Sequence, residues 1–448
     1  MKCKLLTIVL LSTFLVTGCN KKSNNENNNV VEDTSIVMVN VPAMFVSARS
    51  STGYDVSIHY EDNYFLRDAN TYDGGLALLS LGSTFSSIDE TKGENFYNTM
   101  GYDHISFFGY EGEPTEDSVA FIMAHKKVNE SDLVALSIRG FDYKKEWTNN
   151  LIIGKEGDHN GWALRTNEVY AELKTYLSEY SNLKLWITGY SRGGAIANML
   201  SSKIIKSEEI EISNENMYVY TFEAPRGLLA ENAVAYENVH NVVNEADAIA
   251  KIAPSKYGLY RCGTDQFIYS ENVDDLLRNF DRQIKLDSFV PKNDSYADDI
   301  TFSDYFINEL FKEQDDENKA YSIESRAYYV DNMQPSLAYF LAMIFSLKSS
   351  TLSNISNAFQ NMSMLDMLAL YGEDGLYNFL KPFIDEDGYP YVEADMKYHC
   401  DKVFKFLSVG QANLLAVLLG EGKNNVSRML AMHYPETSYV LLKYSIGL

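Results

Sequence analysis

The sequence is short of basic residues, prolines and cysteines, and each shortage excludes a class of protein. Its 448 residues include 38 lysines and arginines against 62 aspartates and glutamates, which gives a net charge of −24. A nucleic-acid partner is therefore not expected, because phosphate binding requires clustered basic side chains, and electrostatic docking on anionic lipid is not expected either. The 9 prolines and 26 glycines are too few for a fibrous or low-complexity protein. With 46% apolar and 22% charged residues, the composition is that of a folded globular chain.

The apolar run at the N-terminus is too short to cross a membrane. Residues 5–16 are apolar apart from three hydroxyl residues and follow a short basic segment, whereas a membrane span needs roughly 20 apolar residues. The run ends in LVTGC, which predicts a secretory signal peptide over 1–18 and a lipidated Cys19, as in bacterial lipoproteins. A plain signal peptide with a coincidental cysteine is the alternative. Residues 19–35 then predict a flexible tether, and the protein is expected outside the cytoplasm, lipid-anchored to the cell membrane.

The four cysteines offer few possibilities for a disulfide or a metal site. Cys3 would be removed with the signal peptide and Cys19 would carry lipid, which leaves Cys262 and Cys400. Outside the cytoplasm these two can form a disulfide or remain separate thiols, and the sequence leaves both open. No Cys/His cluster at ligand spacing, acidic calcium loop or nucleotide loop is evident, so neither a metal nor another cofactor is expected.

The order of the predicted elements favours an α/β fold with a helical insertion. Short apolar strands are expected at 119–128, 133–138, 183–188, 217–222 and 239–243, with a helix at 165–180. After Gly263 the pattern becomes helical, with helices expected at 272–286, 302–313, 335–349, 354–370, 397–419 and 424–432, and a closing helix at 438–448. We therefore expect an α/β core over 36–262, a helical insertion or cap over 263–428, and the C-terminal part of the core over 429–448.

The chemistry-bearing motif is Gly-Tyr-Ser-Arg-Gly at 189–193, between a predicted strand and a predicted helix. A sharp strand-to-helix turn pushes its central serine outwards, and side chains two residues before and after the serine would collide, so glycines are needed there. The N-terminus of the following helix directs partial positive charge at the serine. The motif predicts that Ser191 is a nucleophile.

A nucleophilic serine needs a histidine base that is oriented by a carboxylate. In folds of this type the acid follows a later strand, which favours Asp247, with Glu245 as the alternative. Among the seven histidines, only His399 and His433 follow Asp247. His433 is favoured because it lies in a break between two apolar segments near the chain end, whereas His399 lies within a helical pattern.

Two backbone N–H groups must stabilise the oxyanion. One is expected from Arg192, directly after the nucleophile, and the other from the loop that follows the strand at 133–138. Gly140 in that loop permits an unusual backbone, so the N–H of Phe141 is the expected second donor.

These motifs resemble the class 3 (fungal-type) lipase family of α/β-hydrolases, and more closely a bacterial lipoprotein branch whose elbow reads G-Y-S-R-G-G. The matching segments are RGF at 139–141, HNGW at 159–162, WITGYSRGGA at 186–195, YTFEAPR at 220–226, and residues 241–254. The resemblance implies an α/β-hydrolase fold with the roles given above for Ser191, Asp247, Phe141 and Arg192. It also implies that His159 is structural. The chain departs from the family at Phe141, where a hydroxyl residue is usual, and at Ala250, where proline is usual.

The sequence therefore predicts a membrane-anchored serine ester hydrolase, a lipase or esterase, acting on lipid or other esters through an acyl-enzyme. The insertion is expected either to cover the elbow as a cap or lid or to form its own hydrophobic core, and the sequence leaves both open. One alternative is a catalytically idle lipoprotein that binds ligands or partners on a hydrolase scaffold. Another is a serine peptidase or acyltransferase using the same triad. The oligomeric state is left open.

Overall fold

The computed structural model describes most of the chain from residue 34 onwards. The described residues are 34–45, 52–112, 118–140, 149–150, 152–207, 209–253, 255–284, 296–310, 323–348, 350–351, 354–355, 358, 374–409 and 428–448. The predicted signal peptide, Cys19 and almost all of the predicted tether lie outside them, as does most of the helix expected at 354–370. None of the described helices is both long and apolar enough to span a bilayer.

A seven-stranded sheet forms the centre of the molecule, in the order β11-β9-β7-β6-β5-β4-β3. Its strands are β3 His104–Phe108, β4 Phe121–Val128, β5 Ser131–Ile138, β6 Leu183–Tyr190, β7 Met217–Phe222, β9 Val239–Asn244 and β11 Thr264–Ile268. β3, β4 and β5 pair antiparallel, and the strands from β5 to β11 pair parallel. β6, β7 and β9 are almost wholly buried, because helices cover both faces of the sheet. This arrangement confirms the predicted α/β class.

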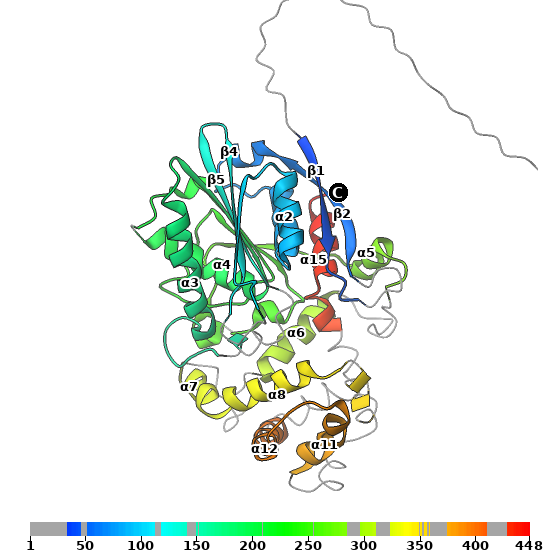
Figure 1. Ribbon diagram of the computed structural model, residues 1–448. Helices are drawn as coiled ribbons and strands as arrows, with labels where there is room; N and C mark the ends of the chain where they lie inside the picture. Colours follow the sequence, from blue (N-terminus) through cyan, green and yellow to red (C-terminus); the bar gives the residue numbers. More distant parts are fainter. Residues whose placement is uncertain are drawn as a thin grey trace, which may run out of the picture.

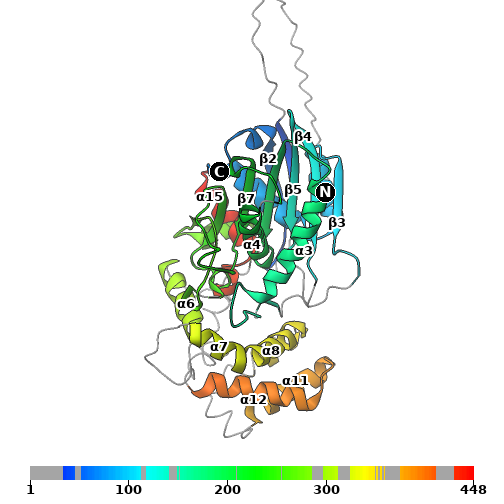
Figure 2. The same ribbon diagram turned by 90° about the vertical axis from the view of Figure 1, so that its left-hand side faces the viewer.

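Helices cover the sheet on two sides (Figures 1 and 2). On one face lie α3 Asn160–Leu177 and α4 Arg192–Lys206. On the other lie α1 Gly74–Ser86, α2 Glu90–Thr99 and α15 Pro435–Ser445, together with the hairpin of β1 Thr34–Val41 and β2 Tyr54–Glu61. The start of α1 is set by Asp73, whose carboxylate accepts a hydrogen bond from the Leu76 amide at 2.9 Å. Elements from the N-terminal and the C-terminal parts of the described chain thus pack on the same face of the sheet.

A helical block lies beyond the carboxyl ends of the parallel strands, opposite the β4–β5 turn (Figure 1). Its helices are α6 Tyr296–Leu310, α7 Ile323–Asn332, α8 Gln334–Ser346, α11 Gly375–Asp387 and α12 Glu393–Val409. They share a hydrophobic core with Ala248 and Ile252 of the loop after β9. The buried Arg326 donates hydrogen bonds to the carbonyls of Ile153 and Gly154. The block is therefore joined to the edge of the sheet where parallel strands end.

The predicted boundary between core and insertion at 262/263 is wrong. β11 pairs with β9 in the central sheet, and α5 Val273–Phe280 packs in the same core as α15. The core therefore continues to at least residue 280. The strand was overlooked because β11 is an edge strand with alternating exposure and three polar residues in TDQFI. Its composition is closer to that of a loop than to that of a buried strand.

The two remaining cysteines are separate thiols. Cys262 is buried among residues of the α3–α4 face, where its thiol contacts the carbonyl of Asn198. Cys400 is buried on α12 in the core of the helical block. The disulfide alternative is therefore not realised.

Candidate active site

Ser191 stands at a strained turn between β6 and α4. Its backbone has φ 53° and ψ −124°, in the positive-φ region that non-glycine residues rarely adopt. A Cβ at Gly189 would lie 2.2 Å from the carbonyl oxygen of Gly193, and a Cβ at Gly193 would lie 2.4 Å from the carbonyl oxygen of Ile138. Both glycines are thus required by close backbone approach. Although Ser191 is the N-cap of α4, its hydroxyl makes no capping hydrogen bond and stays available for other contacts.

The Ser191 hydroxyl meets a histidine and a carboxylate in a line. His433 Nε2 lies 2.8 Å from Ser191 Oγ, and His433 Nδ1 lies 2.6 Å from Asp247 Oδ2, although Asp247 and His433 are 186 residues apart. With Asp247 ionised, Nδ1–H donates to the carboxylate and Nε2 accepts the serine proton. Asp247 is completely buried, whereas the His433 side chain is 16% exposed. The geometry is that of a nucleophile, a base and an orienting acid.

The loop that carries Asp247 is fixed from two sides. The Ile249 amide donates to Asp247 Oδ1 at 2.7 Å, so both carboxylate oxygens have partners. Arg261 donates through one guanidinium nitrogen to the carbonyls of Ala224 and Ala250, at 2.8 and 2.9 Å. The arginine therefore braces the loop at Ala250, the position where the family usually has proline.

The segment that carries His433 is held by the strands next to it. The Tyr190 hydroxyl donates to the carbonyl oxygen of His433 at 2.7 Å. The side-chain Nδ2 of Asn244 donates to the carbonyl oxygen of Met432 at 2.9 Å. Tyr190 directly precedes the nucleophile, and Asn244 ends the strand that leads to the acid. The residues flanking two members of the triad thus position the third.

A second buried carboxyl group lies beside Asp247. Glu223 follows β7 with φ 49°, is completely buried, and accepts a hydrogen bond from the Asn244 amide at 3.0 Å. Ser438 places its hydroxyl 3.0 Å from the other carboxyl oxygen of Glu223. Burial and the charge of Asp247 raise the pKa of Glu223 well above its ordinary value. This shift favours the protonated form of Glu223, whose proton the Asp247 carboxylate can accept.

The expected oxyanion donors are described in part. Arg192 is the first residue of α4, where backbone N–H groups have no partner within the helix. Its guanidinium donates a hydrogen bond to the carbonyl oxygen of Ser118. Phe141 lies outside the described residues. Its neighbour Gly140 packs against the elbow, because a Cβ there would lie 1.9 Å from the carbonyl oxygen of Tyr190.

Comparison with known proteins finds a family match in one part of the chain. The family model described as Lipase (class 3) matches residues 135–257, which run from β5 past Asp247. This part of the chain is similar to the class 3 lipase family. The fold, with its parallel strands, nucleophile turn and flanking helices, is that of an α/β-hydrolase.

The class 3 lipase relatives are similar over short stretches. A lipase of Rhizomucor miehei is 27% identical over 109 residues, which are 23% of this chain and 29% of that protein. A triacylglycerol lipase of Arabidopsis thaliana is 43% identical over 54 residues, 12% of this chain and 10% of that protein. This chain thus spans less than a third of either relative. A solved fungal lipase–inhibitor complex is 18% identical, with a TM-score of 0.35, over 47% of this chain and 81% of its own.

The alternative site residues lie elsewhere in the fold. His399 is on α12, where its Nδ1 lies 3.0 Å from the Ser336 hydroxyl and its ring stacks on Tyr339. Glu245 is exposed. His159 is fully buried and stacked on Trp162 at 3.6 Å, and burial lowers the pKa of His159 to about 3. The structure therefore brings His433, and not His399, to Ser191.

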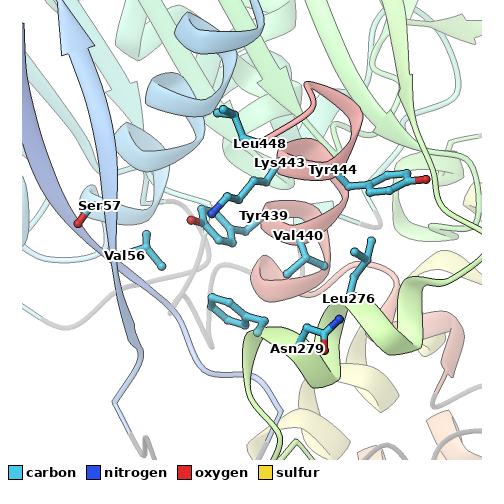
Figure 3. A pocket seen from close by; sticks show the side chains of 10 residues that line it. Val56, Ser57, Leu276, Asn279, Tyr439, Val440, Lys443, Tyr444 and Leu448 are labelled. Atoms are coloured by element: carbon cyan, nitrogen blue, oxygen red, sulfur yellow. The ribbon is translucent and has the colours of Figure 1, made fainter.

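A separate cavity lies between β2, α5 and α15, with a volume of about 520 Å³ (Figure 3). Its walls include Val56, Leu276 and Tyr439, and Lys443 and the C-terminal Leu448 also line it. None of the three triad residues is among the lining residues. The cavity is thus distinct from the site at the elbow.

Sequence reasoning missed the residues that support the triad. Tyr190 and Glu223 fall inside motifs that carry the family resemblance, and Arg261 falls just outside them. For Glu223 a signal was present, since a carboxylate directly after a buried strand needs a partner or a proton. For Arg261 no local pattern shows that its side chain reaches the loop of Asp247.

Proposed function

We propose that the protein is a membrane-anchored serine ester hydrolase, a lipase or esterase, which works through Ser191, His433 and Asp247. The observation that carries the proposal is the imidazole of His433, which bridges Ser191 Oγ and Asp247 Oδ2 at 2.8 and 2.6 Å. An imidazole between a serine hydroxyl and a buried carboxylate can take up and return the hydroxyl proton.

In the first half-reaction Ser191 Oγ attacks the ester carbonyl carbon while His433 Nε2 takes the hydroxyl proton. Asp247 stabilises the imidazolium that forms and keeps its proton on Nδ1 directed at the carboxylate. The imidazolium then protonates the leaving alcohol as the tetrahedral intermediate collapses to an acyl-enzyme. In the second half-reaction His433 removes a proton from water, which attacks the acyl-enzyme and releases the acid.

The negative oxygen of the tetrahedral intermediate needs donors already in place. The backbone N–H of Arg192 is favoured by its position at the N-terminus of α4, where the helix dipole adds partial positive charge. Gly140 is packed against the elbow, which supports the N–H of Phe141 as the second donor. A backbone donor at that position requires no hydroxyl side chain.

Acylglycerols or other lipid esters are the proposed substrates. The relatives from Rhizomucor and Arabidopsis are named as a lipase and a triacylglycerol lipase. The helical block beyond the ends of the parallel strands supports a cap over Ser191, because its core includes Ala248 from the loop of Asp247. The predicted lipid on Cys19 would hold the enzyme at a membrane, where such esters are concentrated.

Labelling with a fluorophosphonate probe tests the nucleophile. Wild type should label, and Ser191→Ala should not. Ser201→Ala is the matched control, since Ser201 lies on the same helix with its hydroxyl bonded to the carbonyl of Ala197. Loss of labelling in both variants, or none in wild type, would contradict the proposal and favour a ligand-binding protein on a hydrolase scaffold.

Ester turnover tests the base and the substrate class. His433→Ala should lower kcat by roughly 10⁶-fold, as in other serine triads, and His399→Ala should leave it nearly unchanged. p-Nitrophenyl esters of short and long chain, compared with peptide substrates, separate an esterase, a lipase and a peptidase. Membrane fractionation of Cys19→Ser tests the lipid anchor separately. If the anchor prediction is correct, wild type is found in the membrane fraction and the variant is not.

A further inference from the structure

A cluster of two histidines and an aspartate lies at the end of the sheet remote from Ser191. Asp103 directly precedes β3, His104 is the first residue of β3, and His125 lies in the middle of β4. One ligand atom from each side chain lies within 4.8 Å of the other two. The antiparallel register places His104 directly opposite His125, and the Asp103 amide donates to the carbonyl of His125 at 3.0 Å. Backbone pairing thus holds all three residues together.

His125 is held in one orientation by groups outside the cluster. Its Nε2 lies 2.8 Å from Oδ1 of the buried Asp132, and its ring stacks on Tyr180 with centroids 4.1 Å apart. Asp132 is itself fixed, because Lys127 contacts Oδ1 at 2.8 Å and the Ser181 amide donates to Oδ2. A carboxylate that accepts Nε2–H leaves the lone pair on Nδ1, and His125 Nδ1 lies 3.3 Å from Asp103 Oδ1.

We propose that Asp103, His104 and His125 bind a Zn²⁺ ion. Two imidazole nitrogens and a carboxylate oxygen form a ligand set that suits zinc, with water completing a tetrahedral site. A carboxylate behind a ligating imidazole, as Asp132 stands behind His125, is the usual support of such a ligand. The net charge of −24 favours a divalent cation.

The ligand atoms need only a small rearrangement. Zinc–ligand bonds of roughly 2.0–2.2 Å place the ligand atoms of a tetrahedral site roughly 3.4 Å apart, and His125 Nδ1 and Asp103 Oδ1 already lie 3.3 Å apart. Asp103 and His104 are exposed and can change rotamer, whereas the buried His125 supplies the fixed point. The ion would join the turn after α2 to β3 and β4. Since β3 is an edge strand, zinc binding should stabilise that edge.

No motif with short spacing between its ligands predicts this site from the sequence. Asp103 and His104 are adjacent, but His125 comes from the next strand, and only the hairpin register brings it beside them. The cluster is also independent of the proposed hydrolase activity, because the elbow follows the opposite end of β6.

Isothermal titration of the full chain in detergent, stripped with EDTA and titrated with ZnCl₂, tests the proposal. Wild type should bind one Zn²⁺ ion at the cluster, and His104→Ala should weaken this binding at least tenfold. Asp132→Asn should weaken it by roughly 10–100-fold, the range for residues that support a ligating histidine. His59→Ala, which removes another exposed histidine from a strand, should bind as wild type does.

Thermal unfolding gives a second readout that does not involve catalysis. ZnCl₂ should raise the Tm of wild type and of His59→Ala but not that of His104→Ala, and MgCl₂ should raise none of them. Equal zinc affinity in wild type and His104→Ala, or a Tm increase that survives the His104→Ala substitution, would overturn the proposal. In that case His125 only makes polar contacts with Asp103 and Asp132.

Discussion

Replacing Glu223 by glutamine tests whether a neutral carboxyl group supports the triad acid. In the folded protein, burial and the neighbouring Asp247 charge raise the pKa of Glu223 above its ordinary value of 4.5. Between the unfolded and the folded pKa, the folded protein keeps a proton that the unfolded chain has released. The free energy of unfolding of wild type therefore falls, through this group, by about 1.4 kcal/mol for each pH unit in that interval.

Glutamine has nearly the same shape and does not titrate. The free energy of unfolding of Glu223→Gln minus that of wild type should therefore rise with pH by about 1.4 kcal/mol per unit, starting near the unfolded pKa. Other groups with raised pKa values contribute equally to the free energy of unfolding of both proteins, so their contributions cancel in this difference. One of them is Glu436, whose pKa burial raises to about 7. Urea unfolding of both proteins between about pH 5 and pH 8 measures it. A difference that is constant, or that shrinks as pH rises, would refute the reasoning, because Glu223 would then not be held neutral.

Activity supplies a matched contrast. The amide of Glu223→Gln can still donate to Asp247, so its kcat should stay within about tenfold of wild type, or about 1.4 kcal/mol of barrier. Glu223→Leu fills a similar volume without polar atoms and leaves the Asn244 amide without its acceptor, at about 1–3 kcal/mol of stability. It should also lose much more activity than Glu223→Gln. Equal activities of the two variants would show that the carboxyl group only fills space.

Three further substitutions follow from the site. Asp247→Asn should lower kcat for a short-chain ester by roughly 10⁴-fold with the fold intact, and a rate near that of wild type would contradict its role. Gly189→Ala places a Cβ 2.2 Å from the Gly193 carbonyl oxygen, so its Tm should fall and its activity should be lost; a stable, active variant would refute the steric argument. Arg261→Ala frees the carbonyl of Ala250 from a 2.9 Å hydrogen bond. It should lower kcat about tenfold, or about 1.4 kcal/mol, with an unchanged circular dichroism spectrum, whereas an unchanged kcat would show that the loop needs no brace.

Local patterns were sufficient to predict the central strands and the elbow. β6 and β7 are apolar and bounded by polar residues, and the glycines around Ser191 are required by contacts within the turn itself. Such features depend on residues that are neighbours in the sequence, so they can be predicted from the sequence alone. β11 was missed because only one of its five residues is buried and three of them are polar.

The choice of base and the role of Glu223 depend on tertiary contacts. His399 and His433 both follow Asp247, and only folding shows that α12 keeps His399 within the helical block while α15 returns to the sheet. Glu223 is within a motif that was recognised, yet its neutral state follows from complete burial beside Asp247. Neither burial depth nor a neighbour from another loop can be deduced from residue spacing.

The long separation of Asp247 from His433 in the sequence is tolerated because the histidine is positioned by residues of the central sheet and of the segment after β1. Tyr190 and Asn244 hold the backbone on either side of the imidazole, and both belong to strands of the core. Just after His433, the buried Glu436 accepts the amides of Met44 and Phe45, which fixes the start of α15 against the segment after β1. These contacts require that the chain return to one place on the sheet, and they set no condition on the length between. A helical block of any size that begins and ends near this edge therefore leaves the line from Ser191 to Asp247 unchanged.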